Sequence, residues 1–389
     1  MFSSIVSSKD LQEENRTSMT GNKSKKIKLN NDHLRKINKP FIKSIKSPDG
    51  DIIDCVLFHL QPAFDLPELK GKKKWTPPEL PKGHNVAGKT PEMKQLWNSK
   101  GESCPNGTIP IRRTIAGDIL RSGSISKFGK KYHRKDNQDV TAGHEHAIGR
   151  VKEGEFYGGK AIFNIWEPNV TWNDFSLSQM WISTDGLPHL LNTIEAGWHV
   201  YPHIYKDNLP RLFNFWTPDA YRSGCYNLHC PGFIQTSQKL SLGAAIGPIS
   251  TYNGPQYDTA FMMWKDPKSG DWWLSVGSEV IGYWPATLFT DLQDYATTVE
   301  YGGEVYSPRS AGRHTSTEMG SGHFEDEGFG RAAYVRNLEV VDEDNVLHEV
   351  SKLETFAEKP NCYGVESGYS DDWGNYIYFG GPGYNPDCL

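Results

Sequence analysis

The 389-residue sequence lacks any run of about 18 apolar residues, so it offers no candidate for a membrane-spanning helix. It also lacks a basic excess: 42 Lys and Arg stand against 47 Asp and Glu, and the formal net charge of −5 disfavours a nucleic-acid partner. Phosphate-binding glycine loops, the HExxH zinc motif and the GxSxG nucleophile motif are absent too. These absences disfavour nucleotide-dependent enzymes, zinc proteases and serine hydrolases.

The first residues have no apolar stretch of the length that a signal peptide needs. Residues 1–29 are polar and charged, and we expect them to be disordered.

Cysteine is scarce, but its six positions are informative. The even count, without CxxC or Cys/His spacing, favours disulfides and no bound metal. Sequence neighbourhood favours Cys225 with Cys230 and Cys362 with Cys388, which leaves Cys55 for Cys104; other pairings stay open. Disulfides are typical of a secreted, extracellular or vacuolar protein, although no signal peptide is visible.

Glycine, proline and aromatic residues are abundant, with 38 Gly, 24 Pro, 12 Trp, 18 Tyr and 17 Phe, which favours short strands joined by turns. Residues 30–104 predict a small unit with a hairpin around "SPDG", and residues 105–136 predict a linker. From residue 137 to 389, strand-like pieces alternate apolar and polar residues, and one helix is expected over 285–296. The predicted fold is all-β: an antiparallel, jelly-roll-like β-sandwich behind a small, mostly β N-terminal domain.

Two histidines in "GHEHA", His144 and His146, could share one face of a strand. Two ligands do not make a metal site, so we interpret them as structural or supporting residues and predict no metal or cofactor.

The stretch "NTIEAGWHVYP" places one acid, Glu195, among apolar neighbours. Strand alternation puts Glu195 on one face with small residues and Trp198 on the other. A second acid comes from "TVEYGGEVYS", where Glu300 and Glu304 lie at even spacing. Two carboxyls in one cleft would share a proton, so one could activate water while the other protonates a leaving group. A solvated strand residue is the alternative interpretation of Glu195.

Long blocks of the sequence resemble the neprosin family of plant proteins. "LRKINKPFIKSIKSPDGDIIDCVLFHLQPAFDLPELKGKK" is similar to its activation peptide, and "NTIEAGWHVYPHIYKDN", "GCYNLHCPGFIQ", "VEYGGEV" and "WGNYIYFGGPGYNPDC" resemble blocks of its catalytic region. The resemblance implies a glutamic endopeptidase that cleaves after proline at acid pH, without metal. It implies Glu195 and, by the preceding glycines, Glu304 as the catalytic pair, with an inhibitory prodomain at residues 30–104.

Proline-containing peptides are the implied substrates, and Trp198, Tyr301 and Trp284 are candidates to line a proline pocket, with core packing as the alternative. Prodomain removal is expected in the basic segment 126–139, which we interpret as exposed. Two other functions stay open: a catalytically silent sandwich that binds cell-wall glycan or peptide, and a carboxyl-pair glycosidase, which the separation of the two carboxyls would test.

Overall fold

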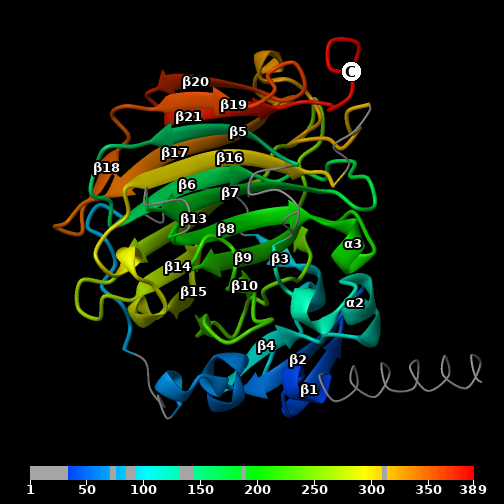
Figure 1. Ribbon diagram of the computed structural model, residues 1–389, viewed down its shortest axis with the longest axis vertical. Helices are drawn as coiled ribbons and strands as arrows, with labels where there is room; N and C mark the ends of the chain where they lie inside the picture. The colour runs from blue at the N-terminus through cyan, green and yellow to red at the C-terminus, as the bar shows by residue number, and fades with distance from the viewer. Residues whose placement is uncertain (1–33, 71–75, 85–92, 132–142, 185–189, 309–312) are drawn as a thin grey trace, which may run out of the picture.

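The computed structural model describes residues 34–70, 76–84, 93–131, 143–184, 190–308 and 313–389. Its regular structure is nearly all β, and every pair of named strands runs antiparallel (Figure 1). The prediction of an antiparallel β-sandwich is therefore confirmed. The expected disorder of residues 1–29 lies outside the described residues.

Two large sheets form the sandwich. The seven-stranded sheet has, in order, β10 (Cys225–Tyr226), β9 (Arg211–Thr217), β8 (Thr193–Val200), β7 (Phe175–Ser183), β16 (Thr298–Tyr306), β5 (His144–Val151) and β19 (Glu354–Ala357). The nine-stranded sheet has β11 (Ile234–Gln235), β15 (Glu279–Trp284), β14 (Trp272–Val276), β13 (Asp258–Lys265), β6 (Gly158–Asn164), β17 (Ala333–Val341), β21 (Gly374–Gly380) and β20 (Gly364–Ser370), with β18 (Leu347–Glu349) paired to β17. Most of these strands coincide with the alternating stretches of the sequence.

The helices are short and lie between the strands. The α-helices are α2 (Ala116–Arg121) and α3 (Pro202–Tyr205); the 3₁₀ turns are η1 (Phe58–Leu60), η2 (Pro62–Asp65), η3 (Pro67–Leu69), η4 (Leu96–Asn98), η5 (Ile125–Lys127), η6 (Ala286–Leu288), η7 (Asp291–Gln293) and η8 (Glu325–Glu327). The helix expected over 285–296 is wrong: the chain makes η6 and η7 there, because Phe289 between them is extended and the backbone N–H groups of residues 290–292 donate to Asn192 Oδ1. Among the described residues no helix is long and apolar enough to span a membrane.

The core fills the space between the two large sheets, and strand alternation decides which side chains enter it. On β8, Ile194, Ala196 and Trp198 point into this core. The other face of the seven-stranded sheet carries a second cluster, here called the aromatic cluster: Ile148, Phe175, Leu177, Trp181, Tyr201, Tyr205, Phe213, Phe215, Tyr226 and Tyr306. This outer face would be open to water if the N-terminal region did not cover it.

The N-terminal region forms its own sheet of β1 (Phe41–Lys46), β2 (Ile52–Leu57) and β4 (Thr108–Arg112), at the lower end of Figure 1. β1 and β2 make the hairpin that the Pro-Asp-Gly turn predicts. A further pair, β3 (Lys94–Gln95) with β12 (Ile246–Gly247), joins this region to the sandwich. The segment 105–136, predicted to be a linker, contributes β4 and α2, while the predicted boundary at residue 137 lies outside the described residues.

This region contacts the outer faces of both large sheets. Residues 58–69 supply apolar side chains to a cluster on the nine-stranded sheet. Residues 112–131 lie over the aromatic cluster: the Arg112 guanidinium is 5.0 Å from the Tyr205 ring centre, and Gly129 accepts a hydrogen bond from the Tyr226 backbone N–H at 2.8 Å. The aromatic cluster is thus buried by the N-terminal region.

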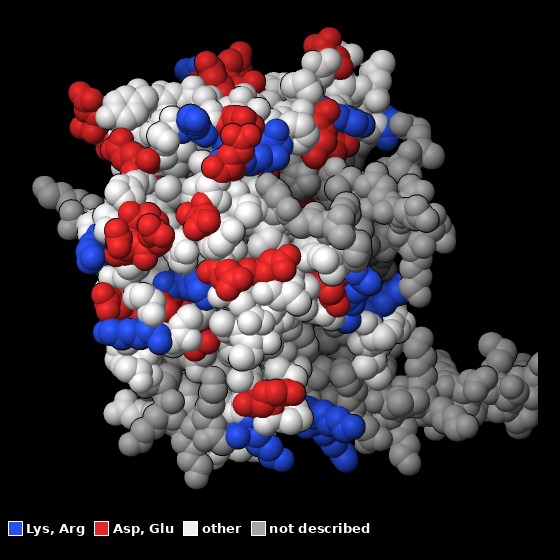
Figure 2. All heavy atoms as spheres, turned by 60° about the vertical axis from the view of Figure 1, so that its left-hand side comes forward, with Lys and Arg blue, Asp and Glu red and all other residues white. Residues whose placement is uncertain are grey.

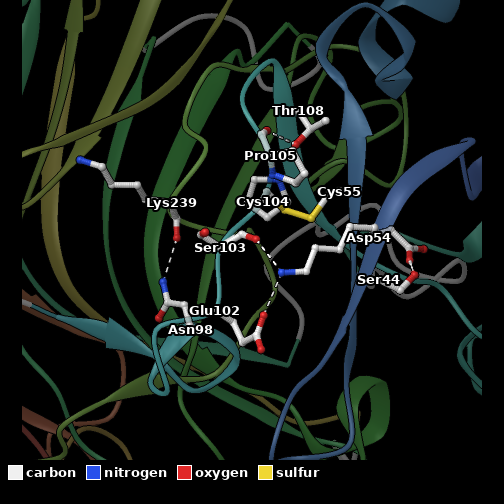
Figure 3. Close-up of a disulfide and its surroundings, with 12 residues drawn as sticks. Ser44, Asp54, Cys55, Asn98, Glu102, Ser103, Cys104, Pro105, Thr108 and Lys239 are labelled. Carbon is white, nitrogen blue, oxygen red and sulfur yellow. Dashed lines mark hydrogen bonds and ion pairs between the residues drawn. A yellow bond between two sulfur atoms is a disulfide. The ribbon is translucent and has the colours of Figure 1, made fainter.

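The three disulfides are the pairs that the sequence favours: Cys55–Cys104, Cys225–Cys230 and Cys362–Cys388. Figure 3 shows the first, which ties β2 to the loop before β4, where Lys43 donates to Glu102 and to the backbone oxygen of Ser103. On the face in Figure 2, acidic and basic side chains are interspersed, and no stripe of one sign appears.

Gly197 on β8 provides a test of how closely the strands pack beside the outer face. A Cβ atom at this position would lie 2.1 Å from the Ser178 carbonyl oxygen and 2.6 Å from the Gln179 Cα atom, which are backbone atoms that cannot swing away. We expect Gly197→Ala to lower the free energy of unfolding by about 1–3 kcal/mol or more, measured as a lower melting temperature. Gly247→Ala, whose Cβ would meet nothing within 4 Å, is the control, and equal melting of the two variants would contradict this packing.

Candidate active site

Glu195 and Glu304 lie on the outer face of the seven-stranded sheet, on the two strands that flank β7. Glu195 pairs with Trp181 of β7, and Glu304 pairs with Leu177 four positions away. Between these two levels, Gln179 pairs with Gly197 on one side and Gly302 on the other, so no side chain rises from either flanking strand. Both glutamates have an exposed fraction of 0%. They therefore share one buried site on one sheet.

The Lys131 ammonium joins the two carboxylates. Its Nζ atom lies 3.1 Å from Oε2 of Glu195 and 3.1 Å from Oε2 of Glu304, so these two oxygens are at most twice that distance apart. Lys131 comes from the N-terminal region that covers the sheet, and its side chain is 3% exposed. The expectation that the basic segment 126–139 is exposed is thus wrong for Lys131, because its charge is held by two buried carboxylates; residues 132–142 lie outside the described ranges.

The remaining partners of the two glutamates differ. Glu195 accepts hydrogen bonds from Gln179 Nε2 at 2.9 Å and from the Tyr221 hydroxyl at 3.3 Å, both neutral groups. Glu304 is bonded through Oε1 to His144 Nδ1, and its Oε2 lies 3.9 Å from His146 Nε2. One carboxylate therefore has neutral partners, while the other has two groups that can carry positive charge.

The pKa of Glu304 reflects this environment. Burial opposes its ionisation, but the Lys131 charge and the bond to His144 outweigh burial and hold its pKa well below the ordinary range. Lys131 itself is desolvated, yet the two carboxylates raise its pKa above the ordinary value. The site is thus occupied by one ammonium and at least one carboxylate.

His144 and His146 both contact Glu304. His146 is oriented from its far side, where Nδ1 lies 3.0 Å from Oε1 of Glu358. Burial lowers the pKa of His146, but the bond to Glu358 and the charge of Glu304 outweigh burial and raise it. Glu358 follows β19, and nothing in its local sequence marks it as part of this site.

The three proposed pocket residues lie elsewhere. Trp198, Tyr301 and Trp284 are fully buried in the core between the sheets. On β8 and β16 an odd number of positions separates Trp198 and Tyr301 from the glutamates, which places them on the opposite face. The aromatic rings beside the glutamates are instead Phe215 and Tyr221, which stack with centroids 5.9 Å apart beneath the Lys131 ammonium.

The choice between Glu300 and Glu304 depends on Lys131. Glu300 shares the outer face, but it is only partly buried, at the level of Trp181. Glu304 is completely buried and shares the Lys131 ammonium with Glu195. This contact favours Glu304 as the partner of Glu195.

Comparison with known proteins gives two family matches. The family model described as Neprosin matches residues 172–382, and the one described as Neprosin activation peptide matches residues 44–150. Among solved structures, scytalido-glutamic peptidase with a peptide-based transition state analog matches at 10% identity, covering 61% of this chain and 97% of that chain, with a TM-score of 0.32. SCP-B, a member of the eqolisin family of peptidases, matches at 10% identity with a TM-score of 0.29, covering 61% of this chain and 96% of that chain. An agglutinin from chicken liver matches at 8% identity with a TM-score of 0.22, covering 41% of this chain and 92% of that chain. At these values the structural likenesses carry no argument about function.

Replacing Lys131 tests the charge balance of the site. In Lys131→Met two carboxylates stay buried without their cation, so we expect the intact chain to lose about 3–5 kcal/mol of stability at pH 7, measured by thermal unfolding. Lys131 lowers the pKa of Glu304, so its contribution is present above the ordinary value of 4.5 and is lost as the pH falls below it. The difference between variant and wild type should therefore shrink below pH 4.5.

The matched control is Lys130→Met, one residue earlier, where the exposed ammonium donates to the Arg222 carbonyl oxygen and to neither glutamate in the described structure. It should melt like the wild type. Equal melting of Lys131→Met and Lys130→Met at pH 7 would contradict the bridging role of Lys131.

Proposed function

The chain belongs to the neprosin family, and from this premise and the paired glutamates we propose that it is a glutamic endopeptidase, made as a zymogen, that cleaves peptide bonds after proline at acid pH. The observation that carries the proposal is the shared ammonium: Lys131 of the N-terminal region occupies the point from which both Glu195 and Glu304 are reached. A water molecule at that point would contact both carboxyl groups once the N-terminal region has left.

The unequal partners of the two glutamates assign their roles. After Lys131 leaves, Glu304 keeps His144 and His146, which favour its ionised form. Glu195 keeps only the neutral partners Gln179 and Tyr221. Glu304 is then the general base and Glu195 the general acid.

The proposed reaction needs only these two groups and water. Glu304 removes a proton from the water as its oxygen bonds to the carbonyl carbon, and Glu195 donates its proton to the carbonyl oxygen, which gives a tetrahedral diol. Glu304 then donates the proton it received to the amide nitrogen, while Glu195 takes back a hydroxyl proton. The C–N bond breaks, and acid and amine are released with the pair restored to its starting state.

The aromatic rings beside the pair support preference for proline. Phe215 and Tyr221 lie on the side of Glu195, and the Lys131 ammonium is 5.9 and 5.4 Å from their ring centres. Removal of Lys131 would expose a flat aromatic surface next to the acid. A proline ring packs well on such a surface, and lacking an N–H it leaves no donor unsatisfied there.

The N-terminal region supports the zymogen part of the proposal. It matches the activation peptide of the family, covers the aromatic cluster and places a cation on both glutamates. The region acts as an intramolecular inhibitor for as long as Lys131 stays in place. The three disulfides support synthesis in an oxidising compartment, and we place the protein outside the cell or in the vacuole.

Acid would release this inhibitor through buried histidines. Burial holds the pKa of His199 at about 3, with repulsion from Arg211 as a smaller cause. When the cleft opens, the ring regains water and a pKa near 6.5. The buried neutral ring thus stabilises the closed form fully above pH 6.5, and this stabilisation is lost as the pH falls towards 3.

Activity tests the role of the glutamates directly. Acid-matured wild type should cleave a fluorogenic peptide after proline, with a maximum between about pH 2 and 7 and no effect of added chelator. Glu195→Gln and Glu304→Gln should each lower kcat by at least about 10²–10⁴-fold. If folded, matured wild type cleaves no peptide but binds cell-wall glycan or peptide, the silent binding module is correct; cleavage of a glycan would favour the glycosidase.

The pH at which maturation begins tests the histidines. Burial, then the charge of Arg112, lowers the pKa of His229, whose ring packs 4.6 Å from Phe128 of the N-terminal region. His229→Gln removes this titration, so we expect processing at pH 5 to be about tenfold slower and its midpoint to move to lower pH, as followed by gel electrophoresis. The control is His348→Gln, which replaces an exposed histidine of β18 that pairs with Asp342. An unchanged midpoint in His229→Gln would rule out this histidine as an acid trigger.

A further inference from the structure

We propose that the mature enzyme has a carboxylate-binding subsite at Arg211, three to five residues from the scissile bond, which selects substrates with an acidic side chain at that position. The inference rests on the proposed peptidase function and adds a second determinant of its specificity. In the intact chain, two aspartates of the N-terminal region occupy this subsite.

Arg211 is a fully buried guanidinium at the start of β9. Its Nη1 atom donates to Asp51 Oδ2 at 2.5 Å and its Nη2 atom donates to Asp49 Oδ2 at 3.2 Å. Both aspartates belong to the turn between β1 and β2. The guanidinium also lies over the Tyr205 ring, with its carbon 4.5 Å from the ring centre. A buried arginine that holds two carboxylates from another part of the chain is already a carboxylate-binding site.

Arg211 lies on the same face of the sheet as the catalytic pair. Along β8 and β9 the paired residues are Glu195 with Phe215, Gly197 with Phe213, and His199 with Arg211. Alternation keeps all of them on the outer face. Phe215 and Arg211 lie four positions apart on β9, about 13 Å at 3.3 Å per position. An extended peptide that follows the strand would place a residue three to five positions from the cleaved bond at the guanidinium.

Loss of the N-terminal region would leave N–H donors of Arg211 without the two carboxylates that accept from them. Asp49 and Asp51 leave, and so does Arg112, which shares Asp51 through its Nε atom at 2.8 Å. Asp207 stays, and it accepts hydrogen bonds from Arg211 Nε at 3.3 Å and from Arg211 Nη2 at 2.6 Å. The Gly243 carbonyl oxygen also stays, 2.9 Å from Arg211 Nη1. The retained carboxylate holds one edge of the guanidinium. The other edge, which faced the two aspartates, is open to a substrate carboxylate.

The neighbouring ring adds positive charge at acid pH. His199 pairs with Arg211 and stacks on Phe213 at 4.3 Å, with Nε2 3.2 Å from the Tyr205 hydroxyl. Burial is the main cause of its low pKa, and this cause weakens when the cleft opens. Arg211 and a protonated His199, with Asp207 as the retained carboxylate, then give this end of the cleft a net positive charge. His229 is a further base that opening exposes to water.

A purely structural latch is the competing interpretation of Arg211, and substrate preference separates the two. The experiment uses matured wild type and peptides with one proline before the scissile bond, in which Glu or Gln is placed in turn at each position up to five residues on either side. We expect one position, three to five residues from the scissile bond, at which kcat/KM is at least tenfold higher for Glu than for Gln. This ratio should rise from pH 3 to pH 5.5, as the substrate glutamate ionises with a pKa near 4.3, and should fall with added salt.

Substitutions at Arg211 test whether this residue causes the preference for Glu over Gln. Arg211→Gln should abolish the Glu/Gln ratio at that position, and Arg211→Lys, which keeps the charge without the fork, should retain part of it. Arg331→Gln replaces an exposed arginine that donates to Asn253 in the loop between β12 and β13, and it should keep the full ratio. If Arg211 variants do not fold, the wild-type ratio and its pH dependence still decide whether the cleft has a carboxylate-binding subsite three to five residues from the scissile bond.

Robust cleavage after proline with Glu/Gln ratios within twofold at every position would overturn the subsite and leave the peptidase intact. Cleavage of no peptide at all would overturn both proposals. A ratio that Arg211→Gln leaves unchanged would assign the acidic preference to another group and overturn the role of Arg211.

Discussion

The site depends on one arrangement of charge, a single ammonium between two carboxylates that water does not reach. Two buried carboxylates without a cation would repel each other and face several kcal/mol of desolvation each. Lys131 removes that penalty only while the N-terminal region is docked. Once it leaves, the pair must hold a proton or admit water. In the proposed function, the same contact keeps the enzyme silent and preserves the two glutamates that carry the chemistry.

The sandwich supplies the other constraint: one face of the seven-stranded sheet packs into the core, and the opposite face carries the candidate site. Odd positions of β8 carry Glu195, Gly197 and His199 to the outer face, and even positions carry Ile194, Ala196 and Trp198 into the core. A shift of register by one residue would exchange these sets, so the packing of the core fixes the direction in which the glutamates point. The residues that stabilise the core and the residues of the candidate site are thus encoded on alternate positions of the same strand.

Short-range patterns were sufficient to predict the strands, the β1–β2 hairpin and the face on which Glu195 lies, because alternation and turn chemistry are local. They were insufficient for Lys131, which is bonded to residues 64 and 173 positions away and looks like any other lysine in a basic segment. Trp198 and Tyr301 lie in the core, which the sequence left open as the alternative to a pocket, because aromatic residues serve core and pocket equally. Their odd spacing from the glutamates places them on the other face. The helix expected over 285–296 does not form, because the apolar spacing there does not show that the chain turns at two separate points, η6 and η7.

The disulfides divide the chain in a way that bears on how the inhibitor leaves. Cys55–Cys104 lies wholly before Lys131, and the other two pairs lie wholly after β8, so no disulfide connects the inhibitor to the sandwich. One peptide-bond cut between them is enough for complete physical separation, and no reductant is needed. The departing piece keeps its own disulfide and the β1–β2 hairpin, so a cut alone does not remove the groups with which it contacts the sandwich. Irreversible activation then requires that this piece be diluted or degraded as well as cut.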